Sequence, residues 1–149
     1  MAAEYLASAL QTINNNSAVQ FTEASIPCTK GYVYHEDGTG IFILRGITSG
    51  QCFATYQVTF NGNIALPDGD VVPIAIALVV NGEERTSSKA IYTPQAVDEM
   101  GNVTSTAIIR VPRGCCFSLS VDAVPANTTD TPAPAIDVQN ANLVINRIA

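Results

Sequence analysis

The chain has 149 residues, of which 47% are apolar and 13% are charged, and its formal net charge is −6. The length fits one domain with a hydrophobic core, and seven singly scattered basic residues argue against nucleic-acid binding. The longest apolar run, Val71–Val80, contains Pro73 and is about half the ~20 residues that a membrane-spanning helix needs. So little charge indicates a surface covered by further copies of the chain, or else one rich in Thr, Ser, Asn and Gln.

The first sixteen residues differ in pattern from the rest. Leu6, Leu10 and Ile13 recur at helical spacing in an Ala-rich stretch that ends at three asparagines. We therefore expect a short N-terminal helix in residues 1–16, either a frayed terminus or an anchor through these three side chains. No basic residue precedes the apolar part of this stretch, which predicts assembly in a cytoplasm rather than secretion.

From residue 17 onward the pattern is that of strands and turns. The runs Cys52–Phe60 and Cys115–Ala123 alternate with period two, as half-buried antiparallel strands do. The dipeptides Asp37-Gly38, Asn61-Gly62 and Asn81-Gly82 are typical of tight hairpin turns. Many short strands separated by such turns predict an all-β antiparallel sandwich or jelly roll over residues 17–149, with an exposed loop at 126–135.

Two runs, 41–44 and 74–80, are apolar on both faces of a strand. A strand of that kind needs a second covering layer, and in a small two-sheet protein a neighbouring subunit is the simplest one. Phe53 lies on the otherwise polar face of its strand, where a monomer would leave it exposed. We therefore expect five residues at a subunit interface: Phe53, Thr55, Ile76, Leu78 and Val80.

No catalytic or cofactor-binding pattern is present. The only histidine, His35, leads into a turn, and Asp68-Gly69-Asp70 is a hairpin turn rather than a calcium loop. The four cysteines lack C-x-x-C spacing, so we expect free thiols, with a Cys28–Cys52 bridge as the alternative. The chain is predicted to be a non-enzymatic protein with no metal and no cofactor.

Several segments, in chain order, resemble the trimeric jelly-roll family of the complement globular head and the tumour-necrosis-factor cytokines. The resemblance covers residue 17 to the C-terminus and implies that fold and a homotrimer. Cys115 stands where that family has Asp, and no Gly precedes Leu143. The segments that carry the resemblance are Gly31-Tyr32 with Asp37–Phe42, Cys52–Val58, Leu78–Gly82, Val111–Phe117 and Asn142–Ile145.

The segments VPRGCCFSLSV (111–121) and NANLVINRIA (140–149) also resemble small accessory structural proteins of bacteriophages and prophages. This likeness implies a virion protein, assembled in the bacterial cytoplasm, that decorates a capsid or forms part of a head or tail fibre. Its partner would be a phage capsid or tail protein, bound through the N-terminal segment. The alternative is a receptor- or glycan-binding tip on the same fold, with specificity in the loops 47–51, 84–101 and 126–135.

Overall fold

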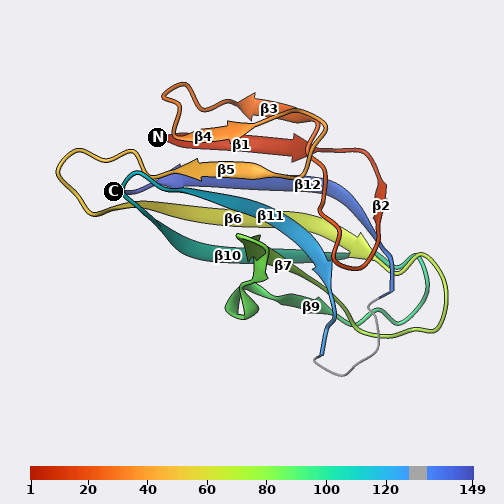
Figure 1. Cartoon of the computed structure of the whole chain (residues 1–149). Coiled ribbons are helices and arrows are strands. Elements are labelled where there is room, and N and C mark those ends of the chain that lie inside the picture. Colours follow the sequence, from red (N-terminus) through yellow and green to blue (C-terminus); the bar gives the residue numbers. More distant parts are fainter. Residues whose placement is uncertain (128–133) are drawn as a thin grey trace.

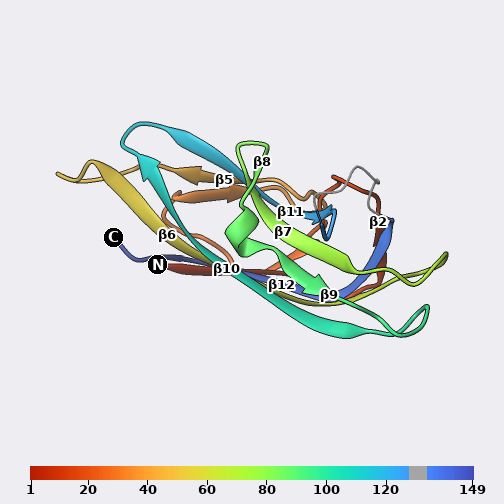
Figure 2. The ribbon, with the colours of Figure 1, turned by 90° about the horizontal axis from the view of Figure 1, so that it is seen from below.

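The computed structural model describes residues 1–127 and 134–149, and it consists of two antiparallel six-stranded sheets that lie face to face (Figures 1 and 2). The described residues contain no α-helix and therefore none that could cross a membrane. Part of the loop predicted at 126–135 lies outside the described residues.

The elements are β1 (Ala2–Ala7), β2 (Gln11–Ile13), β3 (Glu23–Ile26), β4 (Val33–His35), β5 (Phe42–Arg45), β6 (Phe53–Ala65), β7 (Ile74–Val80), β8 (Glu83–Glu84), the 3₁₀ helix η1 (Thr86–Ser88), β9 (Ala90–Tyr92), β10 (Gly101–Pro112), β11 (Cys116–Val124) and β12 (Ile136–Arg147).

Sheet A has the strand order β10-β6-β12-β1-β3, with β2 beside β12. Sheet B has the order β4-β5-β11-β7-β8, with β9 beside β7. Many neighbours in each sheet are distant in sequence, as β1 and β12 are, so the fold closes by long crossovers of the jelly-roll kind. Both alternating runs predicted as strands are strands, β6 in sheet A and β11 in sheet B.

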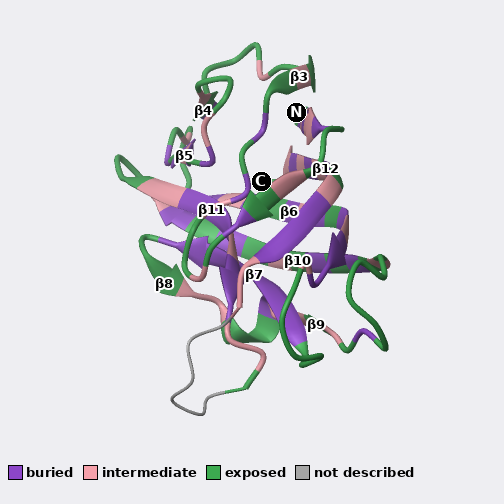
Figure 3. Ribbon diagram, turned by 90° about the vertical axis from the view of Figure 1, so that its right-hand side faces the viewer, coloured by how far each residue is buried: buried purple, intermediate pink, exposed green. Residues whose placement is uncertain are grey.

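The core lies between the two sheets, where Figure 3 shows the inner positions of the strands as buried. Aromatic rings fill its middle. Phe42 contacts Tyr5 edge to face at 4.8 Å and Phe21 at 5.4 Å, while His35 stacks on Phe42 at 4.1 Å. Such edge-to-face pairs add to the stability gained by burying the rings themselves. The same core also contains Leu78 and Leu143, so it joins residues from the first, middle and last thirds of the chain.

The predicted N-terminal helix is wrong. Residues Ala2–Ala7 form β1, an inner strand of sheet A that pairs with β12 on one side and β3 on the other. Ala3, Tyr5 and Ala7 are buried at a period of two, so the true periodicity was that of a strand. Pairing on both edges outweighs the helical propensity of the alanines. Residues 1–16 therefore contribute to the same core as residues 17–149.

The assignment of β7 to a subunit interface also needs correction. Ile76 and Leu78 are fully buried in the core of the chain itself, and Val80 belongs to the same core. The opposite face of β7 carries the small residues Ala75 and Ala77, which are buried as well. Because both faces are covered within one chain, the side chains of Ile76, Leu78 and Val80 are not available to a partner.

Candidate interaction surfaces

The outward face of sheet A is almost free of charge. Apart from Arg110 on β10 and Asp137 on β12, the outward residues of β6, β10 and β12 carry amides, hydroxyls or apolar groups. By register, Thr106, Thr59 and Val144 form one row across the three strands. We call this surface the uncharged face; it comprises Thr55, Gln57, Thr59, Asn61, Asn63, Asn102, Thr104, Thr106, Ile108, Asn142, Val144 and Asn146.

Hydrogen bonds between neighbouring strands hold the side chains of the uncharged face in place. Thr59 Oγ1 lies 3.1 Å from Thr106 Oγ1, and the Asn102 amide donates to Asn63 Oδ1 at 3.1 Å. Short side chains that already hydrogen-bond to each other lose little conformational entropy when another surface covers them. Depletion of charge is the compositional feature of interface cores, so this face is suited to contact with protein.

Charged groups border the uncharged face. Glu4 on β1 accepts a hydrogen bond from the Ser25 hydroxyl at 2.5 Å, and this bond together with one from Asn142 lowers the pKa of its carboxyl. At the other border, the Arg110 guanidinium lies 4.3 Å from the centre of the Phe53 ring. Both charges thus have partners within the chain.

Phe53 and Thr55, two of the predicted interface residues, lie on the outward side of β6; Thr55 belongs to the uncharged face and Phe53 lies beside it. Phe53 is 36% exposed, and with Thr55, Arg110 and Ala149 it lines an open hollow of about 430 Å³. An exposed ring beside an open hollow is available for contact. A subunit contact through Phe53 and Thr55 stays a prediction.

The three predicted anchor residues do not share one surface. Ile13 is buried in the core, Leu6 is half-buried on the outward side of β1, and Leu10 is 53% exposed in the turn between β1 and β2. The spacing of a helix does not bring side chains together in strands that alternate with period two. Leu10 alone of the three is free to meet a partner.

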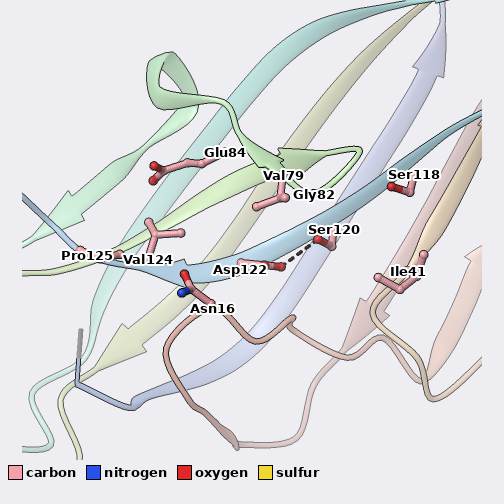
Figure 4. A pocket seen from close by; sticks show the side chains of 10 residues that line it. All are labelled: Asn16, Ile41, Val79, Gly82, Glu84, Ser118, Ser120, Asp122, Val124 and Pro125. Carbon is pink, nitrogen blue, oxygen red and sulfur yellow. Dashed lines mark hydrogen bonds between the residues drawn. The ribbon is translucent and has the colours of Figure 1, made fainter. Parts of the chain in front are cut away.

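A polar hollow of about 550 Å³ lies on the outward side of sheet B (Figure 4). The Ser120 hydroxyl donates to Asp122 Oδ1 at 2.8 Å on one wall, and Asn16 and Glu84 contribute from other segments. Burial raises the pKa of Asp122, and the bond from Ser120 offsets only part of that rise. The hollow offers carboxylate, hydroxyl and amide groups beside the apolar Val79 and Ile41, which sequence reasoning did not bring together.

His35 is part of the core and not of an open site. Its ring is almost wholly buried against Phe42, and Nε2 donates to the carbonyl oxygen of Thr39 at 3.0 Å. Nδ1 lies 3.9 Å from Asp37 Oδ1, beyond hydrogen-bonding distance. An imidazole enclosed in this way is out of reach of a substrate.

The four cysteines are free thiols, so the alternative of a Cys28–Cys52 bridge is not realised. Burial raises the pKa of Cys28, but backbone N–H groups of residues 30–33 that donate to the sulfur have the larger, opposite effect, so the pKa of Cys28 is lowered overall.

Within the described residues no three His, Cys, Asp or Glu side chains converge as a metal site would require. Gly69 has a φ of +83°, the left-handed conformation of a turn, between Asp68 and Asp70.

Comparison with known proteins identifies the fold. No protein-family model matches the chain, and no curated protein matches it in sequence. Among solved structures, the globular domain of zebrafish complement 1qA protein superposes with a TM-score of 0.62 at 12% identity, over 99% of this chain and 97% of that one. The Eiger TNF structure from S. frugiperda superposes with a TM-score of 0.67 at 13% identity, over 100% of this chain and 92% of that one. The chain therefore has the jelly-roll fold of the complement head and tumour necrosis factor.

Proposed function

We propose that this chain is a non-enzymatic structural protein that assembles as a homotrimer through the uncharged face of sheet A. The observation that carries the proposal is how little charge the outward residues of β6, β10 and β12 bear: among them only Arg110 and Asp137 are charged, in a chain whose net charge is −6. A soluble protein keeps charge on surfaces that face only water, whereas interface cores lack it. The jelly-roll likeness supports the choice of three subunits.

The two edges of sheet A supply what a closed ring needs. A threefold ring has heterologous contacts, in which one patch of a subunit meets a different patch of the next. Ile108 on β10 and Ile26 on β3 are exposed at opposite edges of the sheet, on either side of the uncharged face. Isoleucine side chains at both edges would let each subunit contact two neighbours through apolar groups.

A matched pair of substitutions tests this assembly. Ile108 on β10 is 56% exposed and Ile91 on β9, in sheet B, is 55% exposed. Ile108→Lys places an ammonium at the proposed contact and should raise the trimer dissociation constant about 10- to 100-fold, whereas Ile91→Lys should leave it unchanged. Sedimentation equilibrium should give three times 15.7 kDa for the natural chain at micromolar concentration. A monomer at that concentration, or equal effects of the two lysines, would reject the proposal.

We further propose that the assembled protein is a component of a bacteriophage virion, either decorating the capsid or in a head or tail fibre. The support for this placement is the likeness of residues 111–121 and 140–149 to small phage structural proteins. Mass spectrometry of purified particles, released from the bacterium that encodes the chain, should find it at a fixed ratio to a capsid or tail protein. Its absence from every particle fraction would contradict the placement.

A second candidate function is a receptor- or glycan-binding tip, which the polar hollow on sheet B favours. Its hydroxyl, amide and carboxylate groups are those that hydrogen-bond to sugar hydroxyls. Glycan-array binding that is lost in the double variant Asn16→Ala/Ser118→Ala, and kept in Thr22→Ala at an exposed position outside the hollow and the predicted specificity loops, would support it. No binding above background on the array would leave the structural role alone.

A further inference from the structure

Charge is separated along the long axis of the molecule. One end, where both termini lie in Figure 1, is formed by segments 27–33, 45–55, 110–116 and 145–149, which contain no Asp or Glu. We call it the basic end. Its charged side chains are Lys30, Arg45, Arg110, Arg113 and Arg147.

The opposite end is formed by two long loops, residues 66–73 between β6 and β7 and residues 93–100 between β9 and β10. Figures 1 and 2 both show these loops together at the far side from the termini. They contain no Lys or Arg, and we call this the acidic end. Its charged side chains are Asp68, Asp70, Asp98 and Glu99, all exposed.

The loops of the acidic end are held together as one surface. The backbone N–H of Asp98 donates to the carbonyl oxygen of Leu66 at 2.9 Å, which ties the two loops to each other. The Tyr92 hydroxyl donates to Glu99 Oε1 at 2.9 Å and fixes that carboxylate beside them. Four apolar side chains are exposed among the acidic ones: Val71, Val72, Val97 and Met100.

The basic end has a similar construction with the opposite charge. The loop before β6 is bonded to the turn after β10: the N–H of Arg113 donates to the carbonyl oxygen of Cys52 at 2.8 Å and that of Gly114 to Gly46 at 2.9 Å. Ile47, Phe53 and Ile148 are exposed there among the cations. Each end thus combines exposed apolar side chains with charges of one sign, and the signs are complementary.

We propose that the acidic end of one copy binds the basic end of the next, so that copies associate end to end. Each end on its own has the charge that would attract the other, and the chain's net charge of −6 opposes most other approaches of two copies. The two patches lie at opposite ends of the long axis, so the contact is heterologous and does not close into a ring. It generates a linear stack, and it does not depend on the proposed trimer.

The contact is weak and sensitive to salt. Each patch has only three or four exposed apolar side chains, which is small for a stable interface, and its charges are exposed except for Arg147, which is half-buried against Tyr32. Screening shortens the range of such charges from about 20 Å at ~20 mM salt to about 4 Å at ~500 mM. Stacks should therefore form at low salt and separate at high salt, where the lateral oligomer alone remains.

Two double variants with the same change in net charge test the acidic end. Asp68→Asn/Asp70→Asn removes two of its four negative charges, and Glu36→Gln/Glu83→Gln removes two exposed negative charges outside both ends. In sedimentation velocity at ~20 mM salt, the first should weaken concentration-dependent association about five- to tenfold, and the second should not. Equal effects of the two variants, or no association of the natural chain at low salt, would overturn the proposal.

A charge swap makes the test directional. Asp68→Lys/Asp70→Lys cancels the net charge of the acidic end, and Arg45→Glu/Arg113→Glu removes most of the net charge of the basic end. Neither should stack by itself at low salt, whereas an equimolar mixture should associate, because the unchanged acidic end of the second chain meets the unchanged basic end of the first. A mixture that stays as unassociated as its components would overturn end-to-end binding. The size of the particle at ~500 mM salt reports the trimer separately, so the two proposals fail independently.

Discussion

Strands β6 and β7 lie in different sheets and present opposite patterns. In β6 the inward residues are buried while the outward ones, such as Gln57, Thr59 and Asn61, are polar and at least partly exposed. In β7 all seven residues are buried. Both faces of β7, the strand that is apolar throughout, are therefore buried within one chain. The outward face of β6, the alternating strand, is the one that a partner can contact. Apolar character on both sides of a strand therefore does not by itself indicate a subunit interface.

The small size of the residues on the outward side of β7 explains how a few groups of the same chain can bury them. Ala75 and Ala77 need little cover, and Val124 on the neighbouring strand packs beside them with Ala126. The Lys89 ammonium donates to the carbonyl oxygen of Pro125 at 2.9 Å and lies 3.4 Å from Glu84 Oε1. Glu84 pairs with Val79 near one end of β7, and Pro125 follows Val124, the partner of Ala75 near the other end. Because the Lys89 ammonium contacts both Glu84 and Pro125, we infer that the aliphatic part of its side chain lies across the outward side of β7.

The largest effect is expected for Leu78→Ala in β7. Leu78 is fully buried between the sheets, so its truncation should lower the free energy of unfolding by about 2–5 kcal/mol through lost burial and a residual cavity. Thr59→Ala on the outward side of β6 should change it by less than about 1 kcal/mol. Urea denaturation at high salt measures both. Similar losses for the two variants would contradict the contrast drawn between the strands.

Phe53→Ala should produce the next largest effect, in association rather than folding. The ring is partly exposed and contacts Arg110 at the border of the uncharged face, so the folded subunit should lose less than about 1 kcal/mol. If the ring is a subunit contact, the trimer dissociation constant should rise about tenfold or more, because aromatic side chains dominate interface energies. Sedimentation equilibrium of the variant gives this constant, and an unchanged value would remove Phe53 from the interface.

How much the sequence could predict depended on whether the information was local. Period-two alternation is local, and it located β6, β11 and the jelly-roll class correctly, whereas Asn61-Gly62, predicted as a hairpin turn, lies inside β6. The stretch with Leu6, Leu10 and Ile13 was misread because pairing with β12, more than 120 residues away, decides its structure. The residues that pack on Ala75 and Ala77 are Val124 and Ala126, outside β7, and no pattern within β7 signals them. The polar hollow was missed for the same reason.

Removing the cover over β7 should have an intermediate effect. Lys89→Ala deletes both the ammonium and the stem and should lower the free energy of unfolding by about 1–2 kcal/mol. Lys89→Met keeps most of the stem, so it should retain about half of that stability. Thermal or urea denaturation of the two variants separates the contribution of the stem from that of the charge. Equal losses would mean that the stem contributes nothing and that β7 is covered by other groups.

The smallest effect is a change in pH dependence at Asp122, on the neighbouring strand β11. Burial raises the pKa of this carboxyl in the folded chain above the ~3.9 of an unfolded one. The folded state therefore holds the proton more tightly, and the stability that Asp122 contributes is present below the unfolded pKa and lost as the pH rises through the folded pKa.

The variant Asp122→Asn tests this pH dependence. The asparagine cannot ionise, yet its Oδ1 can still accept a hydrogen bond from the Ser120 hydroxyl. The variant should match the natural chain near pH 3 and become slightly more stable than it toward neutral pH. Urea denaturation at a series of pH values measures the difference, and a natural chain that gained stability over the variant as the pH rose would mean that the hollow favours the carboxylate after all.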